Sequence, residues 1–251
     1  MIDFTIAQEY TLPSEGKVYK QNVNPRVKLR SMTTAEEMKR LNHSDRPYKA
    51  MSEIIDDCLV SDLGISAYDL CITDYQYLLH RLRVVTYGPE YKLTSTCPYC
   101  GSVNKNVLNL DHLNITTFDQ ETFDKYSEIT LPVTKKRIKL RMQSPRILDD
   151  INIDSKEQKR RSPNMVGDPA FLITLKSLIE TVDDVKYEEF KLMPFIQKLP
   201  MMDTNYILKS AQKLNTVFGI DTQLLNICSN CGLDYTSSFR TTSEFFGPSI
   251  D

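Results

Sequence analysis

The residues of this chain that could do chemistry form two copies of a Cys-x-x-Cys-Gly motif. They read "CPYCG" at residues 97–101 and "CSNCG" at residues 228–232. A Cys-x-x-Cys turn points two sulfur atoms and nearby backbone N–H groups at one place, and the glycine accepts the backbone dihedrals that follow. This is the outline of a zinc knuckle. The predicted metal ligands are Cys97, Cys100, Cys228 and Cys231.

Residues typical of β-strands flank both motifs, so each knuckle is expected at the tip of a β-hairpin. "EYKLTST" and "VNKNVLNL" surround the first motif, and "QLLNI" and "DYTSSF" surround the second. A structural zinc site normally takes four ligands in a tetrahedron, whereas one hairpin supplies only two thiolates. We therefore predict one Zn²⁺ per chain at a four-cysteine site shared by both hairpins. Sites of this type also accept iron.

The long separation of the two motifs leaves other interpretations of the cysteines open. Residues 101–227 lie between them, far more than the roughly 15 to 20 residues of a compact zinc ribbon. A thioredoxin-like redox pair would place its motif at the start of a helix, but strand-like residues follow here. Disulfides would require an oxidising compartment. Separate metal sites would need further ligands, and the histidines, His43, His80 and His112, show no ligand spacing.

Composition sets limits on the setting and partners of the protein. The chain has 251 residues, with 31 basic and 33 acidic side chains. This near-neutral balance argues against broad wrapping of nucleic acid. No apolar run is long enough to cross a bilayer, and the start of the sequence does not resemble a secretory signal. Cys58 and Cys71 lie in apolar surroundings, which indicates buried free thiols in a reducing cytoplasm.

The sequence contains no recognisable catalytic motif. It has no phosphate-binding glycine loop, no G-x-S-x-G elbow and no H-E-x-x-H, and only eight glycines in all. A thiol–disulfide enzyme would need a reactive thiol of low pKa, which metal ligation would deny it. We therefore expect a protein that is not an enzyme and has no small-molecule substrate.

Hydrophobic periodicity divides the first half of the chain into strands followed by helices. Residues 1–30 read as extended. Thr33 and Glu36 form a capping-box pattern that opens a helix. Further helices are expected over residues 50–60, and from residue 66 or 73 to residue 86 before Gly88 and Pro89. The first knuckle follows directly.

The second half repeats this order of strands, helices and knuckle. Residues 128–142 alternate around a short turn, which predicts a β-hairpin with a basic face. The polar stretch at residues 154–169 predicts an exposed loop. Helical patterns follow, one interrupted at Pro194 and the last ending at Gly219.

These elements predict an α+β fold, in which helices pack with short antiparallel β-hairpins and two of the hairpins are zinc knuckles. We expect residues 1–251 to form a single integrated domain. The alternative is two lobes, residues 1–142 and 143–251, joined by the zinc site.

Four phrases of the sequence are similar to the baseplate hub proteins of T4-like bacteriophages. They are "YTLPSEGKVY", "VKLRSMTTAEEMKRL", "DYQYLLHRLRVVTYGPEYKLTSTCPYCG" and "LPVTKKRIKLR". As an ordered set they cover about the first 142 residues, and the second knuckle and the ending "FRTTSEFFGPSI" are compatible with the longer family members.

The resemblance implies a viral, non-enzymatic protein that promotes or joins assembly of the tail baseplate hub. Its expected partners are other phage baseplate hub proteins, and its expected location is the host cytoplasm during assembly, or the virion tail baseplate. The C-terminal "SEFFGPSID" is a candidate contact peptide. The alternative function is a zinc-ribbon protein that binds nucleic acid through the knuckles and the basic strand at residues 135–141.

Overall fold

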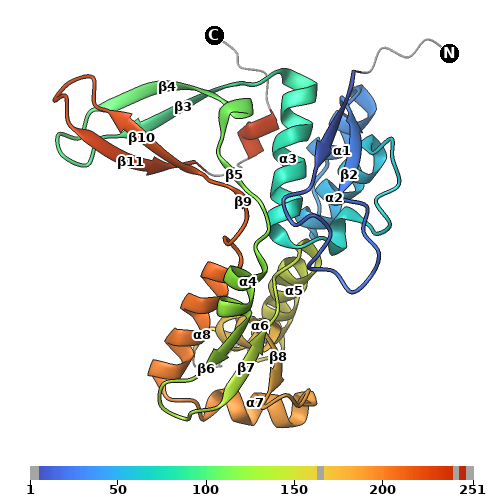
Figure 1. Ribbon diagram of the computed structural model, residues 1–251, viewed down its shortest axis with the longest axis vertical. Helices are drawn as coiled ribbons and strands as arrows, with labels where there is room; N and C mark the ends of the chain where they lie inside the picture. Colours follow the sequence, from blue (N-terminus) through green and yellow to red (C-terminus); the bar gives the residue numbers. More distant parts are fainter. Residues whose placement is uncertain (1–5, 163–166, 240–242, 247–251) are drawn as a thin grey trace.

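The computed structural model describes residues 6–162, 167–239 and 243–246. Figure 1 shows an upper part, a lower part and an arm that projects sideways from the upper part. The upper part comprises residues 6–89, 110–114 and 243–246, and the lower part residues 117–218. The arm comprises residues 90–109 and 223–238, so its two halves come from distant stretches of the chain.

The upper part is built around one buried helix. Its elements are β1 (Ala7–Thr11), β2 (Arg26–Arg30), α1 (Thr34–Leu41), α2 (Pro47–Cys58), η1 (Ala67–Asp69), α3 (Ile72–Tyr87), η2 (Leu110–His112) and η3 (Ser243–Phe246). From Ile72 to Val85, every residue of α3 except Gln76 is buried. The helix ends at Gly88, whose φ of 84° suits glycine. One hydrophobic cluster surrounds α3 and draws on residues between Leu12 and Leu113 and on Phe239, Phe245 and Phe246.

The lower part has its own hydrophobic cluster, formed by residues 129–214. Its elements are α4 (Gln120–Ser127), β6 (Glu128–Thr130), β7 (Arg137–Leu140), α5 (Pro145–Arg161), α6 (Pro169–Leu178), β8 (Ile179–Val182), α7 (Glu189–Gln197) and α8 (Met201–Leu214). The strands form an antiparallel sheet in the order β6-β7-β8. Ile138 and Leu140 of β7 face into the cluster, whereas Arg137 and Lys139 are exposed, as expected for a strand with one buried face.

The arm consists of two antiparallel hairpins, each ending in one Cys-x-x-Cys turn. The first pairs β3 (Glu90–Thr96) with β4 (Val103–Asn109), and the second pairs β10 (Gln223–Ile227) with β11 (Asp234–Ser238). A short pairing of β5 (Ile115–Thr116) with β9 (Gly219–Ile220) lies where the chain passes between the arm and the lower part. The predicted α+β class and the two knuckle hairpins are therefore confirmed.

The upper and lower parts also meet along α2 and α5. Asp149 of α5 accepts a hydrogen bond of 2.9 Å from the backbone N–H of Lys49 in the first turn of α2. Arg146 of α5 pairs with Asp69 at 2.5 Å, and Arg46 pairs with Asp150 at 2.8 Å. The prediction of one integrated domain, with lobes 1–142 and 143–251 as the alternative, remains a prediction.

Several sequence predictions are confirmed at the level of single elements. Thr33 and Glu36 form the predicted capping box at the start of α1. The helix expected over residues 50–60 is α2, and the helix expected to end near residue 86 is α3. The hairpin expected at residues 128–142 is β6 and β7, to which β8 adds a third strand.

The prediction of a loop at residues 154–169 was wrong for its first half. Helix α5 continues to Arg161, and Asp168 caps α6, which begins at Pro169. The Ser144 side chain caps α5, and Glu157 pairs with Arg161 at 2.8 Å one turn later. Residues 154–161 are rich in Lys, Glu, Gln and Arg, which favour a helix even where few apolar side chains mark one face. Among the described residues, no helix is long and apolar enough to cross a membrane.

Asp203 of α8 predicts that acid destabilises the lower part. Its buried carboxylate accepts hydrogen bonds from the backbone N–H groups of Val133, at 2.8 Å, and Thr134, at 2.9 Å, and from the Thr134 hydroxyl. Burial raises the pKa of Asp203, but these hydrogen bonds outweigh burial and hold the pKa below its usual value. Such a group stabilises the fold above its unfolded-state pKa, and this contribution is lost as pH falls through the lower folded-state pKa.

Asp203→Asn is therefore expected to lower the melting temperature by several degrees at pH 7 and to have a smaller effect near pH 2. Thermal unfolding at both pH values measures the difference. The exposed Asp154 of α5 provides the matched control, Asp154→Asn. Equal effects of the two variants at pH 7 would contradict the role given to Asp203.

Candidate metal centre

The two hairpin tips bring all four predicted ligands together at the end of the arm. Their sulfur atoms all lie within 4.8 Å of one another. The Cys97 and Cys231 sulfurs are 3.8 Å apart, and the Cys100 and Cys228 sulfurs are 3.6 Å apart. A tetrahedral site with zinc–sulfur bonds of about 2.3 Å has sulfur–sulfur edges of about 3.8 Å. The four sulfurs are therefore close enough to hold one metal ion and too far apart for disulfides.

Both knuckles have the same backbone hydrogen bonds. In the first, the Cys97 N–H donates to Ser102 O at 2.9 Å, and the Gly101 N–H donates to Cys97 O at 3.0 Å. In the second, the Cys228 N–H donates to Leu233 O at 3.0 Å, and the Gly232 N–H donates to Cys228 O at 2.9 Å. The two glycines have φ angles of 73° and 72°, which other residues rarely adopt. The glycine of each motif is thus required by its turn.

The surroundings favour the thiolate form at two of the four sulfurs. The Ser102 hydroxyl, the Ser102 backbone N–H and the Asn230 side chain lower the pKa of Cys100 to about 6. The backbone N–H of Cys231 is the largest contribution lowering the pKa of Cys228. The Asn104 amide also approaches Cys228 Sγ, at 3.7 Å. At Cys231 the backbone N–H of Leu233 lowers the pKa, but burial and the neighbouring sulfurs outweigh it and raise the pKa to about 12. Because metals bind the thiolate form, the contacts of Cys100 and Cys228 suit metal ligands.

Polar side chains on the facing surfaces of the hairpins hold the arm together behind the cysteines. Asn104 Oδ1 accepts hydrogen bonds from the Ser229 backbone N–H, at 2.9 Å, and from the Ser229 hydroxyl, at 2.8 Å. The Asn106 amide donates to Asn226 Oδ1 at 2.8 Å, and the hydroxyls of Ser95 and Tyr235 lie 2.7 Å apart. These contacts fix the relative position of the knuckles.

These contact residues were not predicted, although the sequence carried a weak signal for them. Asn104 and Asn106 alternate with Val103, Lys105 and Val107 along β4. Alternate residues face opposite sides of a strand, so the two asparagines lie on one face. The sequence does not identify the partner of that face, because β10 and β11 lie more than a hundred residues later in the chain.

A family model described as "T4 bacteriophage base plate protein" matches residues 5–247 of this chain. The chain belongs to this family. Neither the comparison with curated proteins nor that with solved structures found a match. Membership supports a role for this baseplate protein in the phage tail baseplate, with other phage proteins as its partners.

The remaining cysteines and histidines of the baseplate protein lie outside the four-cysteine cluster. Cys58 and Cys71 are buried free thiols, as predicted, and burial raises the pKa of each to about 12. Within the described residues, the cluster contains no histidine. His80 lies in α3 between the rings of Phe239 and Phe245, at centroid distances of 5.3 and 4.9 Å, and burial lowers its pKa to about 4. It is a core histidine.

Two other candidate surfaces are occupied within the chain itself. In the C-terminal peptide, Phe245 and Phe246 are buried in the upper cluster, so these rings are not an exposed contact, and residues 247–251 lie outside the described part. On the basic strand, Lys136 pairs with Asp183 at 2.7 Å, Arg137 with Asp184, and Lys139 with Glu128 at 3.2 Å. These ion pairs neutralise much of the positive charge that binding of a phosphate backbone would require.

Proposed function

We propose that this baseplate protein is an assembly factor or structural subunit of the tail baseplate hub, acting through protein–protein contacts and not as an enzyme. The observation that carries the proposal, beyond family membership, is the arm. It projects from the rest of the molecule and is built from two hairpins with exposed outer faces (Figure 1). We place its activity in the host cytoplasm during assembly and in the tail baseplate afterwards.

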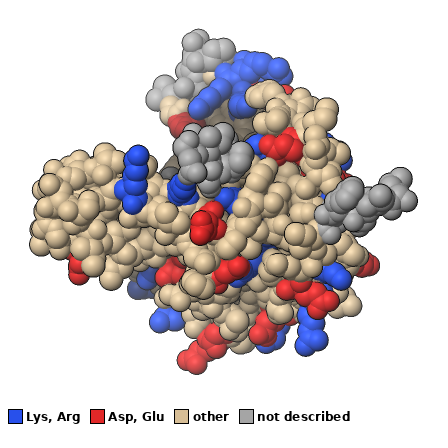
Figure 2. Space-filling model, turned by 90° about the horizontal axis from the view of Figure 1, so that it is seen from above, with Lys and Arg blue, Asp and Glu red and all other residues tan. Residues whose placement is uncertain are grey.

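One strand of each hairpin carries exposed apolar side chains on the outer face of the arm. Leu225 and Ile227 of β10 are 78% and 71% exposed, and Val103 and Val107 of β4 are exposed on the other hairpin. Seen from above, the arm, at the left, shows few charged residues on the face in view (Figure 2). Grouped apolar side chains on an exposed surface are typical of a protein-binding site. This surface is therefore assigned to a neighbouring hub protein.

A structural Zn²⁺ held by Cys97, Cys100, Cys228 and Cys231 would give the arm its rigidity. All four ligands are protein thiolates, which leaves no open position for water or substrate. The arm has a very small apolar interior, consisting of Cys97, Cys228 and Tyr235. Because so little hydrophobic surface joins the hairpins, a metal ion that crosslinks them would hold the binding faces in place. The zinc is thus structural in this proposal.

The proposal predicts that polar replacements on the arm abolish partner binding without unfolding the protein. In Leu225→Ser with Ile227→Ser, recovery of identified hub proteins from phage-infected cells is expected to fall by about tenfold or more. Affinity purification followed by quantitative mass spectrometry measures the recovery. Metal content and melting temperature of the purified variant, both expected to be unchanged, show that the arm is still folded.

The matched control is Phe190→Ser, which removes a 71% exposed apolar side chain from α7 in the lower part. It should retain the hub proteins. If the wild-type protein recovered no hub component, the proposal would be wrong. If it recovered nucleic acid through salt-sensitive binding, the alternative function would replace it.

A further inference from the structure

An open cavity of about 950 Å³ lies at the junction of the lower part and the arm. Its walls come from α4, from α8 and from the chain around β9 and the start of β10. In Figure 1, α4 and α8 lie on the side of the lower part that faces the arm. We call this feature the basic groove, since its lining includes Lys125, Lys209 and Lys213.

The three lysines of the basic groove are placed close together by their helices. Lys209 and Lys213 lie four residues apart on α8 and therefore project from the same face. The ammonium groups of Lys125 and Lys213 lie 5.6 and 5.4 Å from the centroid of the same ring, that of Tyr126. Like charges at this helical spacing destabilise a helix by a few tenths of a kcal/mol. The grouping of these lysines therefore slightly destabilises the folded state.

Within the described parts of the chain, no carboxylate forms an ion pair with any of these three lysines. Lys136, Lys139 and Lys176 are paired. Lys156, Lys186 and Lys198 form no ion pair with the described residues either, but they do not line the groove, so the grouping of three unpaired lysines is what distinguishes it. The groove lining includes one carboxylate, Asp221, which accepts a hydrogen bond of 2.9 Å from the backbone N–H of Gln223. A chain with a net charge of −2 therefore concentrates unneutralised positive charge in one concave place. Such a concentration favours an anionic partner.

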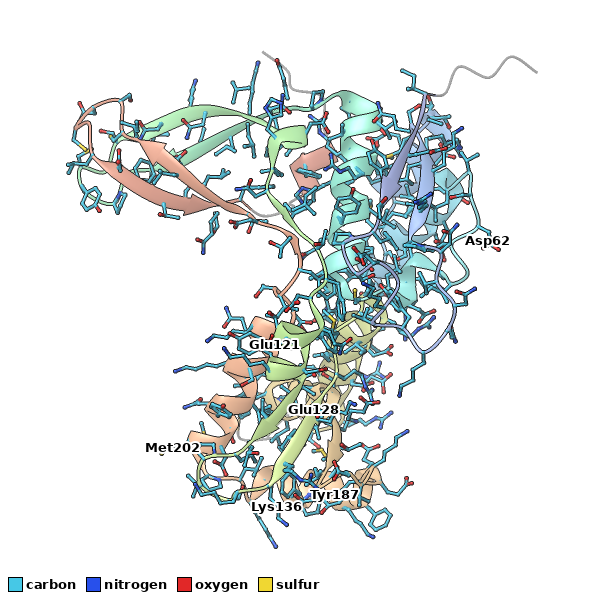
Figure 3. All side chains as sticks on the ribbon, in the orientation of Figure 1. Asp62, Glu121, Glu128, Lys136, Tyr187 and Met202 are labelled. Carbon is cyan, nitrogen blue, oxygen red and sulfur yellow. The ribbon has the colours of Figure 1, made fainter. Side chains whose placement is uncertain are left out.

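The groove is continuous with the apolar face of the arm. Gln223 lines the groove and is the first residue of β10. Leu225 and Ile227 follow at intervals of two residues, so their side chains lie on the same face of the strand as that of Gln223. A ligand that leaves the groove along β10 therefore passes from lysines to exposed apolar side chains. In Figure 3 the label of Glu121 marks α4, which lies beside α8.

From this continuity we infer that the basic groove binds an acidic segment of a partner protein, followed by apolar residues that lie against β10. Carboxylates of the segment pair with Lys125, Lys209 and Lys213, and the hydroxyl and amide groups of the groove, such as Thr222 and Gln223, add hydrogen bonds. The apolar continuation and the presence of Asp221 favour a protein over nucleic acid, whose backbone repeats its charge without interruption. The inference deepens the proposed function, on which it rests for the identity of the partner as a protein.

A direct binding measurement with the purified full-length protein tests the inference. The probe is a fluorescein-labelled synthetic peptide with an acidic half of alternating Glu and Gly and an apolar half of alternating Leu and Thr. Fluorescence anisotropy at low salt is expected to show binding that weakens as salt rises. The variant Lys125→Gln, Lys209→Gln, Lys213→Gln is expected to bind about tenfold more weakly. Its melting temperature should be unchanged or higher, because like-charge repulsion is removed.

The matched control is Lys156→Gln, Lys186→Gln, Lys198→Gln, which removes three exposed lysines elsewhere on the lower part and should bind like wild type. Absence of peptide binding at low salt, or equal loss in both triple variants, would overturn the inference. Tighter, lysine-dependent binding of labelled oligothymidylate than of the peptide would assign the groove to nucleic acid instead. The peptide assay needs no hub protein, so its failure is distinguishable from failure of the proposed function.

Discussion

Replacement of Cys228 by serine is expected to abolish stoichiometric metal binding and to separate the two hairpins of the arm. Three thiolates remain in this variant, and the hairpins are otherwise joined by a few polar contacts and the small cluster around Tyr235. A crosslink closing a loop of this length removes about 4 to 5 kcal/mol of unfolded-state freedom in the chain-entropy model. That is a large part of the roughly 5 to 15 kcal/mol by which a domain is stable.

Native mass spectrometry measures this effect as metal identity and stoichiometry per chain, with and without a chelator. One zinc per wild-type chain and none in the variant are the expected results, together with a marked fall in melting temperature. Cys58→Ser is the matched control, since it changes a buried thiol far from the arm and should retain full zinc. A wild-type protein without metal, or a Cys228→Ser variant with a full complement, would contradict the four-cysteine site.

Replacement of Arg83 by methionine is expected to cost about 3 to 5 kcal/mol of unfolding free energy. The guanidinium is buried in α3 and donates hydrogen bonds to three backbone carbonyls, those of Phe245 (2.9 Å), Gly88 (2.7 Å) and Glu90 (3.1 Å). Methionine fills a similar volume but leaves all three carbonyls without this donor. Glu90 is the first residue of β3, and Phe245 lies in η3. The variant should therefore loosen both the base of the arm and η3.

Urea unfolding measures the loss of stability, and hydrogen exchange of residues 88–92 and 243–246 locates it. The exposed Arg26 of β2 offers a control of the same chemistry, Arg26→Met, which should change stability by less than about 0.5 kcal/mol. Lysine at position 83 keeps the charge but cannot reach three carbonyls, so it should rescue the loss only in part. A stability equal to wild type in Arg83→Met would refute the anchoring role.

The cysteine spacing predicted the most distinctive part of the fold because it specifies both a turn and a ligand set. Each motif required a tight turn with a glycine of positive φ, and strand-forming residues on both sides left a hairpin as the simplest solution. The meeting of the two hairpins followed from the number of ligands that a structural metal takes. Local chemistry also sufficed for the capping box of α1, since its two side chains lie three residues apart.

Features that depend on distant neighbours were not predictable in this way. The C-terminal half of α5 carries few apolar residues, so its polar sequence resembled a loop until the packing of Ile151 and the cap at Ser144 were known. Strand β8 joins β7 across two intervening helices. The pairing of Asn104 with Ser229 depends on the same long-range arrangement. In each case the deciding contact is made with a residue that local periodicity does not identify.

Because the lower part lies between the two halves of the arm in the sequence, the two knuckles are synthesised at different times. The ribosome completes Cys97 and Cys100 first, and Cys228 emerges only about 130 residues later, which takes roughly 6 to 25 s at about 5 to 20 residues per second. Until then the first knuckle can offer only two of the four thiolates. A metal ion held by all four sulfurs could therefore bind only after α4 to α8 have been made, which would delay presentation of the finished arm.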